Sequence, residues 1–559
     1  MKNFLILSLT FFLVSSVSCQ RADRELGVTE TQKHSSKTVS ETRAVPSRQK
    51  QDNPFVKGKI SLKQTVVPTG LAVDNGTIFV NDLKEGKIKL FNMNGKMIDS
   101  IEVPGALPTA LDVRDGIIYY GDIIMKNVLR IKTGDKKGLK PLPFYGLWQK
   151  DLAVTENDII FLDTRRKEIV TTDRYDGSTI RRYKAPGANP TSITYDGRWL
   201  YCGESEEKKI HVIEPETGWV IRSIPSPAGH LSGLSFYKGN LYVSDLHDNS
   251  IHILNLFPDK PLVESETEKY RVVFTVNNRI EGSGSAKNLR NYIAIPQDHP
   301  GQKLISEIKF SPEPDSYVTD KWGQRFAEFK TEHLSPGDTK KVQMSVDVKV
   351  SQAAFHFDPD EFRNIYFTGM KEFLSDGRKY MVNSDYITGK TKELIKDETR
   401  YYYKARKLYE YLADSITYVR EGGWGRADTV IKRGTGSCSE YTFALIALYR
   451  SAGIPSRFVG AFVNRSKHGG LDFVFHRWAE IWMGEKYGWV PVDANAGATD
   501  EPEKRGNAFG SIPNRYLITT ISGGESEYTD WSYNYGVKYD SENGGVVRSF
   551  PLARWIPLD

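Results

Sequence analysis

Three series of apolar positions repeat in phase through the first half of the chain. The first advances by 40, 41, 41 and 41 residues, and its members are Leu71, Leu111, Leu152, Ile193 and Leu234. An aromatic series keeps a similar period and comprises Phe79, Tyr119, Phe161, Tyr201 and Tyr242. A third series comprises Ile88, Val128, Ile169, Ile210 and Ile251. The apolar runs are short, β-rich and bounded by turn residues, so they predict about five repeats of four short strands.

A unit of about 40 residues with four short strands has the size of a β-propeller blade, so we expect a propeller of about five blades over residues 54–260. The fifth repeat stops near Leu256, before an outer strand. Segment 58–62 is similar to the outer-strand segment 95–98, so we expect an N-terminal strand to complete the last blade and close the ring. The motif LYVSD at 241–245 resembles strands of NHL and related propellers, a fold that hosts many activities.

Acidic residues recur just after the aromatic strand of each repeat, at Asp82, Asp122, Asp163, Glu204 and Asp245. Their positions fit carboxylates that cap turns by accepting backbone hydrogen bonds. A ring of metal-binding or ligand-binding carboxylates is the alternative. Cys202 lies in the apolar run 199–202, so we expect it to be a packed, unreactive thiol.

Longer alternating stretches begin beyond the repeats. Residues 270–276 and 341–348 alternate apolar and polar side chains, as half-buried strands do. Seven or so short strands within residues 266–352, with prolines in the intervening loops, predict a small β-sandwich. No catalytic combination of residues stands out in this span.

Composition and charge exclude several classes of protein. The 559 residues are enough for three or four domains, and 39% hydrophobic with 26% charged residues exclude a wholly disordered chain. Lys and Arg number 76 against 70 Asp and Glu, and this small excess gives no indication of a nucleic-acid partner. Cys19, Cys202 and Cys438 are too few for a disulfide framework, a zinc ribbon or an iron–sulfur cluster. We therefore expect no cofactor and no metal site.

The N-terminus has the features of an export signal. The largely apolar run 4–14 is too short for a membrane-spanning helix and fits a signal peptide over residues 1–18. The segment that ends at Cys19 resembles the lipobox of bacterial lipoproteins, although Ser16 stands where that motif usually has leucine. The resemblance implies lipidation of Cys19, and ordinary cleavage after Ser18 is the alternative.

Residues 19–53 are mostly polar and charged and cannot bury enough apolar surface to become ordered, so we expect a flexible tether. Gln20 in place of aspartate favours the outer membrane under lipoprotein sorting rules. We expect a cell-envelope protein that touches the membrane only through its lipid anchor and faces the periplasm or the exterior. A secreted or periplasmic protein is the alternative.

Cys438 stands in a glycine-flanked polar segment, GTGSCSEY at 434–441, and residues 360–420 before it have a helical pattern, notably 391–418. Apolar residues follow at helical spacing, namely Tyr441, Ala444, Leu445 and Leu448. Cys438 would therefore lie at a helix N-terminus, where the helix dipole and free N–H groups favour the thiolate that a cysteine nucleophile needs. A buried structural cysteine is the alternative, although the glycine and polar neighbours argue against it.

A candidate base and its orienting carboxylate follow on two predicted strands. Residues 475–482 and 489–493 are β-rich and are separated by a short turn at 484–488. A hairpin of this kind would bring His476 and Asp493 on neighbouring strands within hydrogen-bond reach. Asp493 would hold one imidazole nitrogen and leave the other to accept the proton of the cysteine thiol.

Four motifs follow one another in this part of the chain: GSCSEY at 436–441, AGIPSR at 452–457, HRWAE at 476–480 and GWVPVD at 488–493. In order and spacing they resemble the bacterial transglutaminase-like superfamily, and YVTDKWGQ at 317–324 is similar to the β domain that often precedes its core. The resemblance implies a papain-like α+β catalytic domain over residues 353–559. It implies Cys438 as nucleophile, His476 as base and acid, and Asp493 as the orienting residue.

Two residues depart from the usual pattern of that superfamily. Arg477 replaces a common small residue and Asn495 replaces a common threonine, and we expect either change to alter substrate entry or loop shape. The resemblance implies acyl transfer, in which a thioester forms with release of an amine and is resolved by water or a second amine. The backbone N–H of Cys438 and one further donor would stabilise the oxyanion. Three tryptophans either line the cleft or pack internally: Trp424, Trp478 and Trp482.

Hydrolysis and crosslinking of a protein or peptide amide both remain open. Because the sequence contains no calcium-site motif, we expect hydrolysis. The propeller is expected to bind a partner and to serve as a recognition module. The competing hypothesis is a non-enzymatic envelope protein that binds through its propeller and uses the C-terminal domain as a scaffold. The joint presence of Cys438, His476 and Asp493 argues against that hypothesis.

Overall fold

A computed structural model describes residues 53–559, apart from residues 65, 104–107, 123–124, 126, 135, 143–148, 259, 363–364, 366–367 and 421–422. The expected signal peptide, the lipidation at Cys19 and nearly all of the expected tether lie outside the described residues. The described residues belong to one compact unit, Asp52–Asp559. Among their helices none is both long and apolar enough to cross a membrane.

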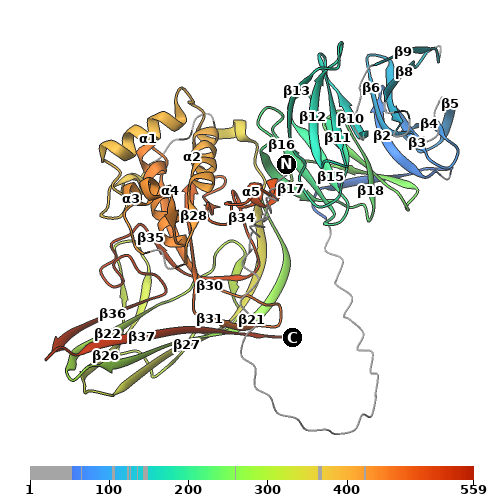
Figure 1. Cartoon of the computed structure of the whole chain (residues 1–559). Helices are drawn as coiled ribbons and strands as arrows, with labels where there is room; N and C mark the ends of the chain where they lie inside the picture. Colours follow the sequence, from blue (N-terminus) through green and yellow to red (C-terminus); the bar gives the residue numbers. More distant parts are fainter. Residues whose placement is uncertain are drawn as a thin grey trace, which may run out of the picture. The chain divides into compact units, whose positions relative to one another are not determined.

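Five four-stranded antiparallel sheets follow one another in the N-terminal half (Figure 1). The first two consist of β2 (Pro68–Asp74), β3 (Thr77–Asp82), β4 (Lys87–Asn92) and β5 (Met97–Glu102), then β6 (Pro108–Arg114), β7 (Ile117–Asp122), β8 (Asn127–Lys132) and β9 (Gly138–Leu142). The next two consist of β10 (Gln149–Val154), β11 (Asp158–Asp163), β12 (Glu168–Asp173) and β13 (Thr179–Lys184), then β14 (Pro190–Tyr195), β15 (Leu200–Glu204), β16 (Lys209–Ile213) and β17 (Val220–Pro225). The fifth combines β1 (Val56–Ser61) with β18 (Leu231–Tyr237), β19 (Asn240–Asp245) and β20 (Ser250–Leu254).

The sequence repeats predict these sheets well. All fifteen positions of the three apolar series are buried, with at most 5% of the residue surface exposed, because each series occupies the same strand of successive sheets. The N-terminal strand β1 pairs with β20, with Ile60 opposite Ile251, and so supplies the missing outer strand. This pairing confirms that the first strand of the region completes the last sheet.

Side chains on the first strand of each sheet bond to the first strand of the next sheet and close a propeller-like ring. The bonds are Thr69 Oγ1 to Pro108 O, Val154 N–H to Asp112 Oδ2, Ile193 N–H to Asp151 Oδ2, Phe236 N–H to Thr194 Oγ1 and Val73 N–H to Ser235 Oγ. The last bond joins the fifth sheet to the first. Such a ring leaves only short, protected strand edges toward its centre.

The recurring acidic residues cap turns. Glu204 accepts backbone hydrogen bonds from residues 189, 206 and 207, and Asp245 accepts them from residues 229, 230, 247 and 248. No group of three potential metal ligands occurs among the described residues. Cys202 is fully buried in an apolar cluster, and burial raises the pKa of its thiol, in agreement with an unreactive cysteine.

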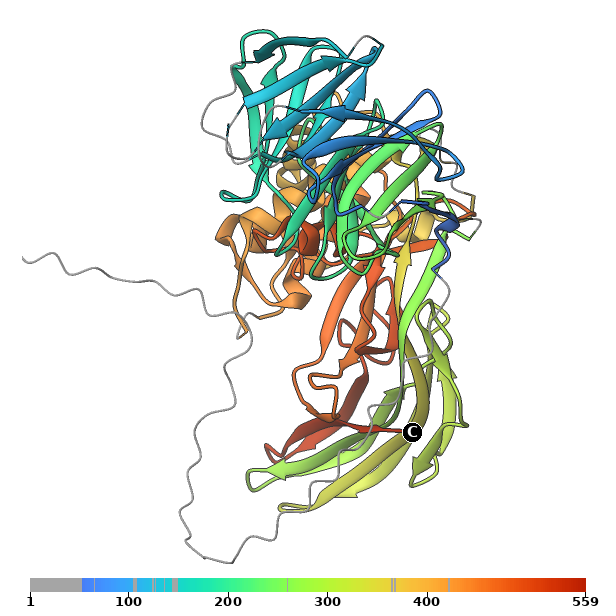
Figure 2. The ribbon, with the colours of Figure 1, turned by 90° about the vertical axis from the view of Figure 1, so that its right-hand side faces the viewer.

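Two sheets pack face to face in the middle of the chain (Figure 2). One consists of β23 (Gln302–Leu304), β27 (Thr339–Phe355), β21 (Leu262–Glu281), β37 (Val546–Pro557) and β31 (Gly470–Asp472), with β24 (Lys309–Ser311) and β34 (Ser511–Ile512) also paired to β27. The other consists of β25 (Ser316–Thr319), β26 (Arg325–Leu334), β22 (Ser285–Ala294) and β36 (Tyr535–Glu542). Their facing side chains are almost fully buried, and include Val272, Phe274, Val346, Ile293 and Phe329.

These sheets include strands from beyond residue 353, where we expected the catalytic domain to begin. The C-terminal strands β36 and β37 return to them, and β37 pairs along β21 with Val272 opposite Trp555. Trp555 is only 2% exposed, so the pairing buries apolar surface that β21 would otherwise expose at a sheet edge. The C-terminal strands therefore belong with the face-to-face sheets rather than with the helical core.

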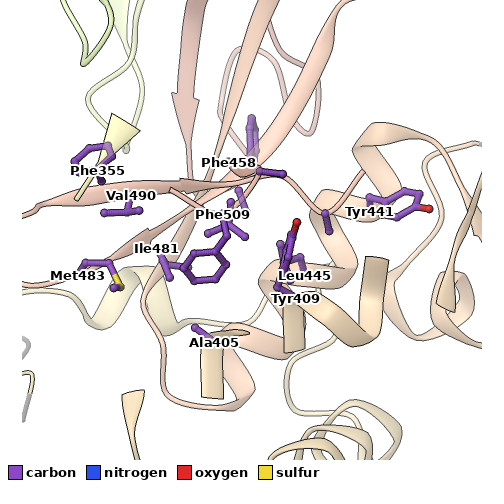
Figure 3. Packing of buried hydrophobic residues seen from close by; sticks show 14 of the residues in the cluster. Phe355, Ala405, Tyr409, Tyr441, Leu445, Phe458, Ile481, Met483, Val490 and Phe509 are labelled. Atoms are coloured by element: carbon purple, nitrogen blue, oxygen red, sulfur yellow. The ribbon is translucent and has the colours of Figure 1, made fainter. Parts of the chain in front are cut away.

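The remaining elements build an α+β core. Its helices are α1 (Asp385–Ile395), α2 (Tyr401–Ser415), α3 (Ala427–Arg433), α4 (Cys438–Ser451) and α5 (Pro502–Asn507), with 3₁₀ turns η1 (Pro359–Phe362) and η2 (Lys371–Leu374). Its sheet has the order β33 (Trp489–Val492), β32 (His476–Trp482), β30 (Ser456–Val463) and β35 (Tyr516–Ser522), beside a short pair, β28 (Thr417–Tyr418) and β29 (Thr435–Gly436). Every residue of α4 from Cys438 to Arg450 is buried. Figure 3 shows the apolar core, with Leu445 and Tyr409 on the helices and Ile481 and Val490 on the sheet.

The helical region before Cys438 is shorter and more broken than expected. The predicted helix over 391–418 is interrupted between α1 and α2, where Lys396 adopts a positive φ of 45° and ends the first helix. Among the described residues of 360–384, the only helical elements are the two 3₁₀ turns. There the Asp376 carboxylate accepts backbone N–H groups of residues 377, 382 and 383, which favours a turn over a helix.

Candidate active site

Cys438 is the first residue of α4, as the sequence predicts, and only 9% of it is exposed. Glu440 fixes the segment around it by accepting the backbone N–H of Ser437 at 3.0 Å and of Gly425 at 2.8 Å. Arg433 neutralises the same carboxylate at 3.0 Å. The thiol is thus held at a helix N-terminus, where the helix dipole and the free N–H groups stabilise negative charge.

His476 begins β32 and follows a tightly held turn. Asp472 is fully buried and accepts the backbone N–H groups of Val463, Val474 and Phe475. Phe475 has a positive φ of 54°, a conformation that a bulky residue adopts only when its surroundings enforce it. Asp472 therefore positions the backbone that carries His476, a role that no motif in the sequence indicates.

Asp493 comes directly after β33, and the predicted hairpin brings it to His476. The register pairs Ala479 with Val492 and Trp482 with Trp489, so Asp493 falls diagonally across from His476 on the same face of the sheet. His476 Nε2 lies 2.6 Å from Asp493 Oδ2. Asp493 Oδ1 accepts the backbone N–H of Ala496 at 3.0 Å, which fixes the carboxylate.

The structure brings all three predicted site residues together. The Cys438 side chain interacts with the imidazole of His476, and because Nε2 is engaged by Asp493, Nδ1 is the nitrogen left for the thiol. Burial opposes the charge on His476, but Asp493 outweighs it and holds the pKa of the imidazole well above its ordinary value. Burial likewise opposes the charged forms of Cys438 and Asp493, yet the interactions with His476 leave the pKa of each below its ordinary value. The arrangement favours a thiolate–imidazolium pair.

Two aromatic rings hold the imidazole plane. Tyr516 stacks on His476 with ring centroids 5.5 Å apart and an interplanar angle of 19°, and Trp478 lies 5.7 Å away at 30°. Tyr516 begins β35 and is opposite Val463 of β30, so it reaches His476 across the sheet. Nothing in its local sequence distinguishes Tyr516, because its contact with His476 depends on the order of strands in the sheet.

The three tryptophans considered as cleft residues have different surroundings. Trp424 is 42% exposed and follows Gly423, whose carbonyl accepts the Ser437 hydroxyl at 3.4 Å, so it lies beside the cysteine segment. Trp478 is buried, and Trp482 packs edge-on against Trp489 near the hairpin turn. Of the three, Trp424 is the one that lies exposed beside the cysteine segment.

The structure also shows the surroundings of Arg477 and Asn495, the two departures from the transglutaminase-like sequence pattern. Arg477 is fully buried, so it does not line an entrance. Asn495 lies in the turn after Asp493, where its carbonyl accepts the N–H of Ala498 at 3.3 Å. Asn495 therefore shapes the loop that follows the orienting carboxylate.

Comparisons with known proteins point to the same region. A sequence profile described as the transglutaminase-like superfamily matches residues 389–494, which contain Cys438, His476 and Asp493. No curated protein sequence matches the chain.

Solved structures similar to the chain include a putative cysteine protease from Cytophaga hutchinsonii, with 13% identity and a TM-score of 0.38 over 53% of this chain and 99% of that one. Glutaminyl cyclase of Myxococcus xanthus shows 10% identity and a TM-score of 0.33 over 36% of this chain and 94% of that one. Virginiamycin B lyase of Staphylococcus aureus shows 15% identity and a TM-score of 0.27 over 36% of this chain and 99% of that one. The chain thus combines a β-rich N-terminal region of propeller-blade-like sheets with a transglutaminase-like core domain.

Proposed function

We propose that the chain is a cysteine-dependent acyltransferase that acts on amide bonds, with Cys438 as nucleophile, His476 as general acid and base, and Asp493 as the orienting residue. The observation that carries this proposal is the placement of Cys438 at the start of α4, where its side chain interacts with an imidazole that Asp493 holds at 2.6 Å. A lowered thiol pKa and a raised imidazole pKa are the conditions under which a cysteine attacks a carbonyl at neutral pH.

The reaction proceeds in two halves. In the first, the Cys438 thiolate attacks the amide carbonyl carbon, and the backbone N–H of Cys438 at the start of α4 stabilises the oxyanion. The tetrahedral intermediate then loses its C–N bond, and the leaving amine takes the proton of the His476 imidazolium, which leaves a thioester on Cys438. In the second, neutral His476 removes a proton from the acceptor as the acceptor attacks the thioester, and the thiolate leaves.

The acceptor decides the outcome. Water needs no dedicated binding surface, so we propose hydrolysis of a protein or peptide amide as the main reaction. An amine acceptor at the same thioester would give crosslinking with release of ammonia from a carboxamide. Both outcomes use the same three residues, so the choice depends on which acceptor reaches the thioester first.

Incubation of the full chain with a panel of glutamine-containing peptides, with and without a primary amine, tests this function. A new peptide N-terminus or a new carboxylate indicates hydrolysis, and amine incorporation with ammonia release indicates crosslinking. Cys438→Ala should abolish either product, whereas Cys202→Ser should not, because Cys202 is buried in the N-terminal ring. A product that persists in Cys438→Ala would refute the proposal.

We propose further that residues 54–260 are an NHL-like propeller that recognises a partner or a large substrate. Leu83 and Met125 lie between the second and third strands of the first two sheets, at one end of the ring, and expose 38% and 46% of their surface. The double variant Leu83→Ser with Met125→Ser should lower kcat/KM for a protein substrate and leave a short peptide amide unaffected. An equal loss of kcat/KM for the protein substrate and for the short peptide amide would contradict a recognition role for that end of the ring.

We also propose that residues 1–18 are removed and that Cys19 is lipidated, which would anchor the protein in the cell envelope. The support is the lipobox-like segment before Cys19. Cys19→Ser should move the protein from the membrane fraction to the soluble fraction of the envelope. An unchanged membrane fraction would contradict anchoring through Cys19.

A further inference from the structure

Arg477 is a fully buried guanidinium inside a cage of aromatic rings. Its Cζ atom lies 4.1 Å from the ring centroid of Tyr533, 4.3 Å from Phe458, 4.9 Å from Trp424 and 5.0 Å from Phe443. These residues come from four separate parts of the chain. Such rings stabilise a cation through their negative faces but supply no counterion.

The hydrogen bonds of Arg477 are incomplete. Nη2 donates to the carbonyl of Trp531 at 2.7 Å, whereas Nε and Nη1 have no hydrogen-bond partner in the structure. Arg477 takes part in none of the ion pairs to a carboxylate found among the described residues. A buried cation in this state carries a large desolvation cost unless a negative charge lies close by.

The thiol of Cys438 is a group able to become an anion within electrostatic reach of this guanidinium. The backbone N–H of Arg477 lies near enough to the Cys438 side chain to help stabilise a thiolate, and the hydroxyl of Thr442 bridges the Cys438 carbonyl at 2.8 Å and the Arg477 carbonyl at 3.1 Å. Two cage residues are tied to the neighbours of Cys438. Tyr533 interacts with Ser439, and Gly423 next to Trp424 accepts the Ser437 hydroxyl.

We propose that the Cys438 thiolate is the counterion of Arg477, so that the site contains two cations that stabilise the nucleophile, His476 and Arg477. This inference rests on the proposed role of Cys438 as nucleophile. Arg477 keeps its charge at any pH at which the enzyme would work, whereas His476 gives up its proton to the leaving amine. Arg477 therefore also favours return of the charge to sulfur when the thioester is resolved.

The other ionisable groups around the thiol do not supply this charge. His476 is paired with Asp493, and Glu440 on α4 is paired with Arg433. Tyr533 and Tyr380 face the guanidinium, and burial raises the pKa of both phenols, which keeps them neutral. Arg477 is thus the one permanent cation in this group that has no carboxylate partner.

The test is the pH dependence of Cys438 alkylation by iodoacetamide in the full chain, followed by peptide mass spectrometry. Arg477→Met keeps much of the side-chain length without the charge, and Arg477→Lys keeps the charge. Arg450→Met is the matched control, because Arg450 is also buried on aromatic Tyr380 but bonds to the carbonyls of Ser456 and Ser375. Each variant is compared with the wild type by circular dichroism and thermal unfolding.

We expect Arg477→Met to raise the pH midpoint of alkylation by about one unit or more, which is a tenfold loss of rate on the acidic side of the profile. Arg477→Lys should retain most of the wild-type midpoint, and Arg450→Met should retain all of it. If Arg477→Met folds and its alkylation midpoint is unchanged, the inference is overturned. The proposed function would still stand in that case, provided that the wild-type midpoint is low. An ordinary thiol midpoint in the wild type would instead refute the proposed function.

His476→Ala provides a second reading should Arg477→Met fail to fold. With Arg477 still present, the midpoint of Cys438 in His476→Ala should stay below the ordinary thiol value of about 8.5. A midpoint at or above that value would show that Arg477 contributes nothing, and would overturn the inference without the Arg477 variant.

Discussion

Nε2 of His476 donates to Oδ2 of Asp493 across 2.6 Å, and the two residues reach each other because one short hairpin aligns β32 with β33. This bond selects the tautomer in which Nδ1 faces the Cys438 thiol. It also places a carboxylate beside the imidazole, so the imidazolium is favoured despite burial. Geometry and charge in the site therefore both depend on Asp493.

Asp493→Asn should lower kcat/KM by about 100-fold or more, as for other triads that lose the orienting charge. The carboxylate raises the pKa of His476, so its removal lets the imidazolium lose its proton at lower pH. Less thiolate–imidazolium pair then remains at neutral pH. The basic limb of the pH–rate profile should move to lower pH, and steady-state kinetics from pH 5 to 9 measure the shift. An unchanged profile would separate Asp493 from the reaction.

Tyr516→Ala should lower kcat about tenfold with a smaller change in KM, because the ring that stacks on His476 is lost and the imidazole gains freedom. Tyr516→Phe is the matched control, since it keeps the ring. The control should therefore retain most of the activity. Equal losses in both variants would show that the hydroxyl matters and the stacking does not.

Asp112 predicts a pH dependence of stability in the N-terminal ring. Burial raises the pKa of its carboxyl from the ordinary 3.8 to about 6. Because the folded-state pKa is raised, the protonated Asp112 carboxyl contributes fully to the free energy of unfolding below pH 3.8. This contribution is lost as the pH rises through 6, and the total loss is about 3 kcal/mol. The free energy of unfolding of the ring should therefore fall between pH 4 and pH 7.

Asp112→Thr tests this prediction with a residue taken from the same ring. Asp112 accepts the N–H of Val154, and Thr194 makes the equivalent bond to Phe236 two sheets further on. The threonine keeps an acceptor without a titrating group. Urea unfolding at pH 4.5 and 7.5 should show a smaller pH effect in the variant and higher stability at pH 7.5. The same pH effect in both chains would assign the dependence to other groups.

Removal of β37 should abolish the folded face-to-face sheets, although the strand lies far beyond the site residues. Trp555 is buried against β21, and loss of a buried tryptophan alone costs about 3–5 kcal/mol. A chain that ends at Asn543 should therefore be insoluble or lack a cooperative unfolding transition. A chain that ends at Pro557 is the control and should behave as the full chain. A soluble, cooperative product of the first truncation would show that β37 is dispensable.

The sequence predicts those features whose signal lies in a local pattern. The period of the apolar series predicts the strands of the ring, and the likeness of segment 58–62 to outer strands predicts its pairing with β20. Cys438 is recognisable because the glycine-rich segment and the helix after it are contiguous. His476 and Asp493 are recognisable because a hairpin turn of a few residues fixes their distance.

Features that depend on long-range pairing leave no such signal. The pairing of Val272 with Trp555 joins opposite ends of the C-terminal half, so neither strand shows locally that the other belongs to it. Tyr516 reaches His476 only through the order of strands in the sheet. Arg477 stands out in sequence as an unusual residue, yet its aromatic cage comes from separate segments that meet only in the fold.

The most direct test of the activated thiol compares the alkylation rates of Cys438 and Cys202 in the native chain. Near pH 6.5, Cys438 should react at least about 100-fold faster, because its pKa lies below the ordinary thiol value and that of buried Cys202 lies above it. His476→Ala should slow Cys438 about tenfold or more at that pH and leave Cys202 unchanged. Equal rates at the two cysteines, or a Cys438 rate unaffected by His476→Ala, would contradict the account.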